Sequence, residues 1–291
     1  MKSLVVGMGI GGLYKTILEK LNHTVITVDL HKDADYNDVP KVLRDHNFFD
    51  CVFICTPNYT HEELAYIISN NARIVFIEKP GLKTPNKWNK LVSMYPNTRF
   101  MMVKNNQYRS EIPFFKTLAE SSESIEIHWI NKNRIPNAGG WFTNKELSFG
   151  GVSRDLMPHL LSIITTLFPD DFRHSDILRN NKKQNWKLSD ISSSDYGIVN
   201  QNGTYNVDDH AEIFLKVCEK ECKLVADWKS DFEDDQSIIF NMKDRSRKFN
   251  LGLCPEYAYS KMITEALANL NDVYWWDQQY IQDLWIHKMV E

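Results

Sequence analysis

Residues 3–12 read SLVVGMGIGG, and this stretch decides the fold class. A short run of aliphatic residues is followed at once by the spacing G-x-G-x-x-G and then by a helical pattern. In this context the glycine turn is typical of dinucleotide binding: the backbone approaches a pyrophosphate at the positive N-terminus of the helix, and the third glycine lets helix and strand pack closely. We therefore expect Gly7, Gly9, Ile10 and Gly12 to contact a dinucleotide.

The first hundred residues repeat this alternation of buried strand and amphipathic helix. Near-continuous apolar runs, typical of strands buried on both faces of a parallel sheet, lie at 24–29, 51–55, 73–78 and 99–103, and helical patterns lie at 37–46, 60–70 and 84–94. The fold class is therefore α/β, with residues 1–107 predicted to form a doubly wound Rossmann domain.

The pattern changes in the second half, residues 108–291, which predicts an α+β domain. Alternating runs typical of antiparallel strands with one solvated face lie at 124–130, 210–217, 223–230 and 237–242, and helical patterns lie at 109–120, 151–167, 257–270 and 275–289. The polar run at 179–185 is typical of an exposed turn.

Composition excludes several classes of protein. The chain has 291 residues, a net charge of −4 and 43% hydrophobic residues, which excludes a disordered chain and a general polyanion-binding surface. No run is long enough to cross a bilayer and no signal peptide is visible, so we expect a cytoplasmic protein. An odd number of cysteines, five, fits a reducing compartment. Cys218 and Cys222 flank a polar turn, where a cross-strand disulfide is conceivable and a zinc site is not expected.

An acidic residue stands at the end of the second predicted strand. Asp29 follows Gly7 by about 20 residues, the distance expected for the carboxylate that binds an adenosine ribose. A carboxylate there repels a 2′-phosphate, which favours NAD over NADP. Lys32, three residues on, is positioned to meet a 2′-phosphate, so NADP stays open.

Two further strand ends carry polar residues. Thr56, Pro57 and Asn58 follow the third strand, at the edge where open α/β sheets bind ligands. Glu78 and Lys79 follow the fourth strand; Lys79 has the chemistry to hold an oxygen undergoing redox. The alternatives are ordinary turn chemistry for the first group and a solvated lysine for the second.

A second chemical cluster lies at residues 150–159. Asp155 and His159 are four residues apart, so on one helix their side chains share a face, and a carboxylate beside an imidazole suits a general base. A simple surface hydrogen bond is the alternative. Trp141 lies in the loop before this cluster, and the pair Gly150 and Gly151 opens it. We expect these residues at the mouth of a cleft, where the glycines allow close approach of the backbone.

Taken together, these motifs resemble the glucose-fructose oxidoreductase / inositol dehydrogenase (Gfo/Idh/MocA) family. The resemblance rests on the glycine turn, ICTPNYTHEELA (54–65), IEKP (77–80), GWFTNKELSFGG (140–151), RDLMPH (154–159) and VDDHAEIFLKV (207–217) followed by ADW. It implies a second domain built on a large open sheet, catalytic or substrate-binding roles for Lys79, Asp155 and His159, a place near the cofactor for Asn106, and homodimers or homotetramers formed through the C-terminal sheet.

The chain departs from the family pattern at three points. The segment between Asp29 and the next helix is short, which changes the adenine side of the site. Phe149 replaces a glycine. Arg154 stands where an apolar residue is usual, and it either pairs with Asp155 or meets an anionic group of the substrate.

The resemblance implies an oxidoreductase that moves a hydride between NAD(P) and a ring carbon of a sugar, cyclitol or nucleotide sugar. Asn106, Trp141 and Arg154 are the expected substrate contacts, and no metal, nucleic acid or membrane is expected to take part. Two alternatives stay open: a non-catalytic dinucleotide or sugar sensor on the same fold, and an enzyme that reduces an imine or a keto group.

Overall fold

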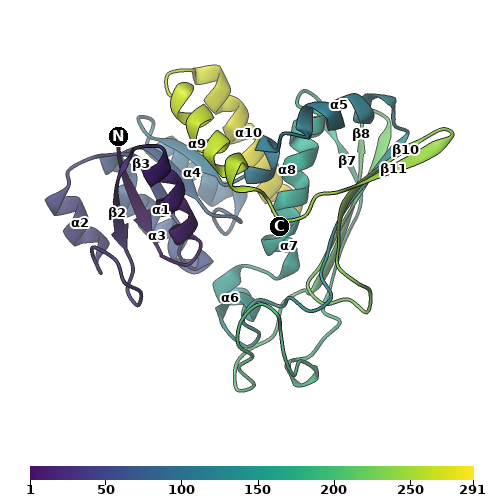
Figure 1. Cartoon of the computed structure of the whole chain (residues 1–291), viewed down its shortest axis with the longest axis horizontal. Coiled ribbons are helices and arrows are strands. Elements are labelled where there is room, and N and C mark those ends of the chain that lie inside the picture. Colours follow the sequence, from purple (N-terminus) through teal and green to yellow (C-terminus); the bar gives the residue numbers. More distant parts are fainter. The chain divides into compact units, whose positions relative to one another are not determined.

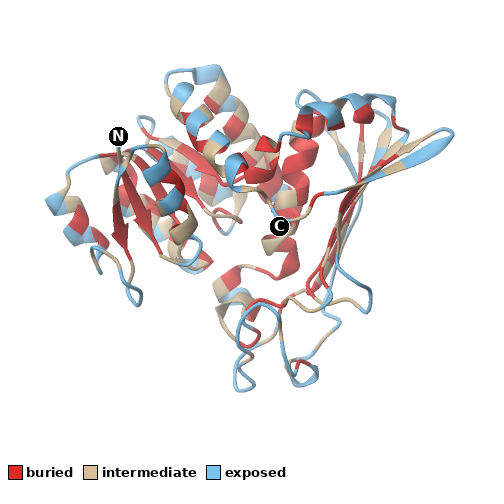
Figure 2. Ribbon diagram, in the orientation of Figure 1, coloured by how far each residue is buried: buried red, intermediate tan, exposed pale blue.

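A parallel sheet forms from the five apolar runs of the N-terminal half in this computed structural model, which describes residues 1–291 (Figure 1). Its order is β2-β1-β3-β4-β5, with every pair parallel. The strands are β1 (Lys2–Val6), β2 (Thr24–Val28), β3 (Phe49–Ile54), β4 (Ala72–Ile77) and β5 (Arg99–Met102). Most of their residues are buried, as strands covered on both faces must be (Figure 2).

Right-handed crossovers decide which face each connecting helix covers. The chain moves from β1 to β2 in one direction and from β2 through β5 in the other, so α1 lies on one face and α2, α3 and α4 lie on the opposite face. Contacts between α2 and α3 and between α3 and α4 agree with this. The helices are α1 (Gly11–Lys20), α2 (Val39–Asp45), α3 (His61–Ile68) and α4 (Pro85–Met94).

The last two helices, α9 (Glu256–Ala268) and α10 (Val273–Val290), complete this first unit. Helix α9 packs against α1, where the ring centroids of Tyr14 and Tyr259 lie 5.7 Å apart. Helix α10 covers the edge of the sheet: the outward N–H of Met102 on β5 donates to Asp283 Oδ2 at 3.0 Å. Asp283 also pairs with Lys104, and both side chains are buried. An edge strand with free backbone groups needs such a cover.

The domain boundaries expected from the sequence therefore need a correction. The first compact unit comprises residues 1–105 together with 255–289, and the second comprises residues 106–254. The break after residue 107 was expected nearly at this place, but the C-terminal helices, expected in the second domain, pack with the first. They do so because the parallel sheet leaves the face beside α1 and the β5 edge uncovered.

The second unit is built on a six-stranded sheet of order β11-β10-β6-β9-β8-β7, in which β6 and β9 alone are parallel neighbours. Its strands are β6 (Ser124–Ile130), β7 (Asp176–Lys183), β8 (His210–Val217), β9 (Lys220–Asp227), β10 (Asp235–Met242) and β11 (Arg245–Asn250). The predicted fold class, a Rossmann sheet followed by a mostly antiparallel sheet, is thus confirmed.

Helices cover one face of this second sheet. Helix α5 (Ile112–Ser121) contacts β10, and α8 (Met157–Leu167) contacts β6 and β9. Alternate residues of β6, Ile125 and Ile127, are fully buried beneath them. Two one-turn helices, α6 (Lys145–Ser148) and α7 (Val152–Asp155), precede α8. Short 3-10 turns lie at Asn58–Thr60, Ser69–Asn71, Asn105–Tyr108, Trp141–Thr143, Phe172–His174 and Leu188–Asp190.

Two edge strands were not expected from the sequence. Most of the run 179–185, interpreted as an exposed turn, lies in β7, and β11 lacks any strong apolar alternation. Cys218 and Cys222 carry free thiols rather than the conceivable disulfide. None of the helices has both the length and the apolar character that a bilayer crossing demands.

Candidate functional site

The glycine turn between β1 and α1 has the geometry that the motif predicts. Gly7 adopts a φ of +90°, and its N–H donates to the Val28 carbonyl at 2.8 Å. A Cβ at Gly7 would lie 2.8 Å from the Cys55 carbonyl, so only glycine fits. At Gly9 a Cβ would meet nothing within 4 Å. The second glycine of the motif therefore faces open space, as it must if backbone is to approach a pyrophosphate.

The close contact between helix and strand is made by Gly11 rather than Gly12. A Cβ at Gly11 would lie 2.8 Å from Val5 Cγ1 of β1, whereas a Cβ at Gly12 would meet nothing within 4 Å. The packing role expected of the third motif glycine is thus wrong for Gly12 and belongs to its neighbour. Gly12 remains a predicted cofactor contact.

Asp29 lies at the end of β2 and fastens the glycine turn. Its Oδ2 accepts the Met8 N–H at 2.7 Å, and its Oδ1 accepts the N–H groups of His31 and Lys32 at 2.8 and 2.9 Å. Burial raises the pKa of Asp29, but these three hydrogen bonds outweigh it and leave the pKa below its ordinary value. The carboxylate is therefore ionised, and it has lone pairs left to accept a ribose hydroxyl.

These residues fit a bound dinucleotide. The N-terminus of α1 has no side-chain cap, so its amides are available to an anion. An ionised Asp29 suits the ribose of NAD. The exposed ammonium of Lys32 lies 3.3 Å from the Met8 carbonyl, beside the same turn, where a 2′-phosphate of NADP would also be expected.

A buried histidine ties together the segments that follow β3 and β4. The ring nitrogens of His61 lie 2.8 Å from the Thr56 carbonyl and 2.8 Å from the Gly81 carbonyl. Burial lowers the pKa of His61. The Thr56 hydroxyl bonds that of Thr60 at 2.6 Å. The Thr56 side chain is thus held by the protein. The roles of Thr56, Pro57 and the buried Asn58 as cofactor contacts stay predictions.

Glu78, at the end of β4, is fixed by a tyrosine of α1. The Tyr14 hydroxyl donates to Glu78 Oε1 at 2.7 Å, and the Lys79 N–H donates to Glu78 Oε2 at 3.2 Å. Burial, followed by the nearby Glu78 carboxylate, raises the pKa of Tyr14. Lys79 is half-buried and precedes a cis peptide bond to Pro80. Its place at the carboxyl end of a parallel strand is the place expected for a residue that acts on a ligand.

In the second unit, Asp155 and His159 do not share one helix. Helix α7 ends at Asp155 and α8 begins at Met157. Pro158 has no N–H to donate to the carbonyl of residue 154, so the helix is interrupted. The His159 N–H donates to the Leu156 carbonyl at 3.0 Å instead. The interpretation of residues 151–167 as one helix is therefore wrong.

Two tryptophans contact this pair of residues. The Trp228 indole Nε1 donates to Asp155 Oδ2 at 2.8 Å. The ring of Trp129 on β6 stacks against the His159 ring, with centroids 5.8 Å apart. Neither tryptophan was assigned a role from the sequence, although Trp228 closes the ADW motif. Spacing along the chain does not show that residues 155 and 228 meet.

An aspartate before β8 fastens the start of α7. Asp208 Oδ1 accepts the Gly151 N–H at 3.0 Å, and Oδ2 accepts the Ser153 N–H at 2.8 Å. A Cβ at Gly151 would lie 1.7 Å from the Asp208 carbonyl oxygen. The glycine pair was expected to admit a ligand at a cleft mouth; at Gly151 the close approach is to the chain's own backbone.

The three expected substrate contacts all lie in the second unit. Asn106 is 1% exposed; its Oδ1 accepts the Arg109 Nε–H at 2.8 Å, while its buried Nδ2 has no hydrogen-bond partner. Arg154 is buried, and a Cβ at Gly150 would lie 2.7 Å from its Cγ. The Trp141 ring is half-buried and stacks on Phe142 at 3.8 Å. Roles in substrate binding stay predictions for all three.

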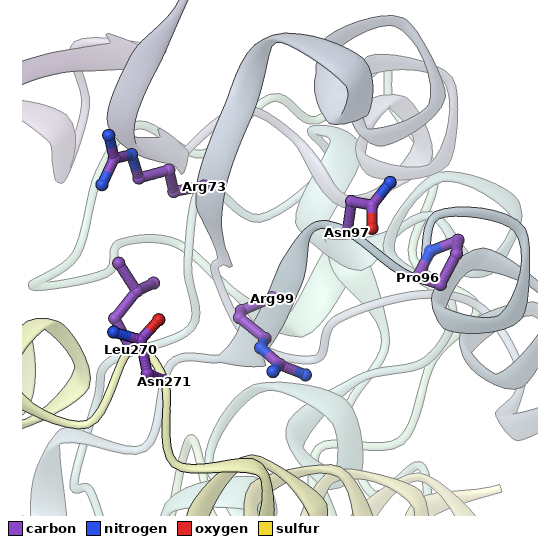
Figure 3. Close-up of a pocket in the computed structure, with 6 residues that line it drawn as sticks. All are labelled: Arg73, Pro96, Asn97, Arg99, Leu270 and Asn271. Carbon is purple, nitrogen blue, oxygen red and sulfur yellow. The ribbon is translucent and has the colours of Figure 1, made fainter.

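A pocket of about 330 Å³ lies in the first unit, at the amino ends of β4 and β5 (Figure 3). Thr56 and Lys79 follow the carboxyl ends of the strands, so they lie at the other end of the sheet. The guanidinium groups of Arg73 and Arg99 point in different directions in Figure 3, so they do not converge on one anion. The pocket therefore adds nothing to the predicted cofactor site.

Comparison with known proteins agrees with the geometry. Residues 4–104 match the model of an oxidoreductase family with an NAD-binding Rossmann fold, Gfo/Idh/MocA. A candidate oxidoreductase subunit of UDP-kanosamine synthase from Amycolatopsis mediterranei is 29% identical over 122 residues, which are 40% of this chain. The match spans about a third, 34%, of that relative's own length.

Two solved structures share the fold of the whole chain. GenD2 from gentamicin A biosynthesis, in complex with NAD, has a TM-score of 0.75 at 15% identity. The match covers 100% of this chain and 92% of GenD2. KijD10, a 3-ketoreductase from Actinomadura kijaniata in complex with NADP and TDP-benzene, has a TM-score of 0.73 at 11% identity, with 97% of this chain and 94% of that chain covered.

The expected cofactor class is confirmed by the same family model, since NAD binding is part of its description. The resemblance stated from the motifs is likewise confirmed over the residues that the model matches. Residues 4–104 are thus similar to the NAD-binding Rossmann domain of the Gfo/Idh/MocA oxidoreductases.

Proposed function

We propose that the protein is an NAD(P)-dependent oxidoreductase that moves a hydride to or from a ring carbon of a sugar. The observation that carries the proposal is the held Asp155 carboxylate, four residues before His159, in a chain whose other unit binds NAD. A protein that only binds a dinucleotide has no need of a carboxylate held by a buried tryptophan four residues before a histidine. The non-catalytic sensor is therefore the weaker alternative.

A nucleotide sugar is the favoured substrate class. The relative from Amycolatopsis mediterranei is named for UDP-kanosamine, and KijD10 was solved with a TDP compound and is named a 3-ketoreductase. Both compounds are linked to a nucleoside diphosphate. We propose the same class for this chain, with oxidation at a ring hydroxyl or reduction of the corresponding ketone.

The proposed mechanism assigns one task to each of three side chains. In the oxidation direction His159 removes the proton of the hydroxyl that is oxidised. Asp155 orients the imidazole of His159 and stabilises its positive charge. Lys79 holds the reacting oxygen and stabilises the negative charge that develops there. A bound nicotinamide would supply the hydride acceptor for the same carbon.

NAD is the proposed cofactor, with NADP as the alternative. An ionised Asp29 favours a ribose with free hydroxyls and repels a 2′-phosphate. Lys32 would have to leave the Met8 carbonyl to meet a phosphate. Comparing the dissociation constants of NADH and NADPH by nicotinamide fluorescence tests the preference: we expect tighter binding of NADH.

Turnover with a substrate panel tests the function. UDP- and TDP-hexoses with NAD, and the matching 3-keto sugars with NADH, are followed at the nicotinamide absorbance. We expect turnover with at least one pair, lost in His159→Ala and Lys79→Ala variants that still bind NADH. Binding of NADH with no turnover of any pair would favour the sensor, and turnover of imines alone would favour the reductase alternative.

A homodimer or homotetramer through the sheet of the second unit stays part of the proposal. The face of this sheet away from α5 and α8 is rich in charged side chains, including the pairs His210–Asp227 and Arg179–Glu212. An interface there would be polar. Light scattering at several protein concentrations and two salt concentrations measures the mass and shows whether salt weakens the assembly.

A further inference from the structure

The indole of Trp228 lies directly against the carboxylate to which the mechanism gives the task of orienting His159. Its Nε1 donates to Asp155 Oδ2 at 2.8 Å, and the side chain is 1% exposed. A hydrogen bond to an ionised acceptor is stronger than one between neutral groups, and burial away from water strengthens it further. The contact therefore favours the ionised form of Asp155 and fixes the direction in which Oδ2 points.

Both partners of this hydrogen bond are held by one short segment. The Trp228 N–H donates to the Asp209 carbonyl at 3.0 Å, and the side chain of the preceding residue, Asp208, accepts the N–H of Ser153 at the start of α7. Adjacent residues before β8 thus hold the tryptophan on one side and the helix of Asp155 on the other. These contacts fix the backbone of both partners relative to one segment.

We propose that Trp228 is a positioning residue of the oxidoreductase: its indole N–H holds Asp155 so that the carboxylate can orient His159. The inference rests on the proposed function. Trp228 acts through Asp155 and does not touch the reacting atoms. The residue type matters, because phenylalanine keeps an aromatic ring at this place but removes the donor.

A pH profile is a suitable readout because the indole N–H of Trp228 bonds a carboxylate, which titrates. Helix α7 packs against α8, β8 and β9. The charged or titratable side chains of α7 and α8 are Arg154, Asp155 and His159, and those of the two strands are His210, Glu212, Lys216, Lys220, Glu221, Cys222, Lys223 and Asp227. Of these, His210 and Asp227 are paired with each other at 2.9 Å. Asp208, just before β8, accepts the backbone amides at the start of α7.

Trp186 provides a matched control in the same unit. Its indole Nε1 also donates a hydrogen bond, at 2.9 Å, to the main-chain oxygen of Lys229. A main-chain carbonyl does not titrate. Trp186→Phe and Trp228→Phe therefore remove the same group from the same residue type. A difference between the two variants reports on the carboxylate and not on the loss of an indole.

The contact itself is tested without any substrate. The protein has eight tryptophans, whose indole N–H signals are resolved by NMR on ¹⁵N-labelled protein and assigned with the two phenylalanine variants. We expect Asp155→Asn to move the Trp228 indole proton upfield, because a carboxylate acceptor is replaced by a neutral one, and to leave the Trp186 signal in place. A Trp228 signal that Asp155→Asn does not move would overturn the inference.

The positioning role is tested by the pH dependence of kcat/KM with the best substrate of the panel. Without the indole N–H, the proton affinity of the Asp155–His159 pair rises, so the acid limb should move to higher pH by up to about one unit in Trp228→Phe. The limb should stay in place in Trp186→Phe. Equal limbs in Trp228→Phe and the unchanged protein would refute the role.

These two measurements separate failure of the inference from failure of the proposed function. If no substrate of the panel is turned over, the proposed function fails while the NMR comparison still decides whether Trp228 binds the Asp155 carboxylate. If turnover is found and Asp155→Asn leaves the Trp228 signal unmoved, the function stands and the inference is wrong.

Discussion

The two units differ in how their functional residues are assembled. In the first, the glycine turn is one continuous stretch, and Thr56 and Lys79 follow strands of the same parallel sheet. In the second, the helix that ends at Asp155 is fastened by Asp208 and the Asp155 carboxylate is held by Trp228, and both lie on distant segments. A cofactor site made from local backbone geometry is therefore visible in the sequence, whereas a side chain fixed by long-range contacts is visible only in the structure.

The largest expected effects separate cofactor binding from chemistry. His159→Ala in the second unit should lower kcat by about 10²–10⁴-fold and leave the dissociation constant of NADH unchanged, because a general base is lost and the cofactor contacts are kept. Asp29→Ala in the first unit should weaken NADH binding by about tenfold or more, since a charged acceptor is lost. Steady-state kinetics and fluorescence titration measure both variants. If Asp29→Ala left NADH affinity unchanged, the first unit would not hold the cofactor as described.

The next effect concerns the dependence of the first unit on its distant C-terminal helices. Asp283→Ala leaves the buried ammonium of Lys104 without its partner, and we expect a loss of about 3–5 kcal/mol in the free energy of unfolding. Glu256→Ala breaks the exposed pair with Lys20 between α9 and α1 and should cost less than about 1 kcal/mol. Urea unfolding measures both. Equal losses would show that α10 is not anchored through Asp283.

A pair of neighbouring glycines tests which one the turn requires for packing. Gly11→Ala places a methyl group against Val5 and should cost about 1–3 kcal/mol. Gly12→Ala meets open space and should be neutral or stabilising, because alanine is about 1 kcal/mol better than glycine in a helix. Thermal unfolding of the two variants decides the matter. A larger loss at Gly12 would restore the packing role to the third motif glycine.

The smallest expected effect is a pH dependence in the second unit. The hydrogen bond with Asp227 raises the pKa of His210 above its ordinary value of 6.5. The charged His210 therefore contributes stability that is fully present below that value and is lost as the pH rises through the folded-state pKa. His210→Gln should destabilise the protein more at pH about 5.5 than at pH about 9. Urea midpoints at both pH values measure the difference, and an equal loss at the two would show that the charged form of His210 adds no stability.

Strands buried on both faces could be predicted because nearly all of their buried residues are apolar. All five strands of the parallel sheet lie close to the predicted runs. The edge strands β7 and β11 were missed, since an edge is partly solvated and imposes little apolar alternation. Residues of β7 such as Asn180 and Lys182 therefore resemble an exposed turn.

Part of the candidate site could not be predicted for a related physical reason. Spacing showed that Asp155 and His159 stand four residues apart, but it did not show that Pro158 interrupts the helix between them. The motifs VDDH and ADW were quoted as carriers of a family resemblance without a task. Asp208 of VDDH bonds the start of α7, and Trp228 of ADW bonds Asp155. Both contacts join segments more than fifty residues apart.

Transfer of a labelled hydride tests the central claim most directly. The protein is incubated with NADH carrying deuterium at nicotinamide C4, in each of its two stereospecific forms, and with a panel of keto nucleotide sugars, and the products are examined by mass spectrometry and NMR. We expect deuterium on one ring carbon of a nucleotide sugar from one of the two forms, with none transferred by His159→Ala. Binding of NADH without transfer of deuterium to any sugar would contradict it.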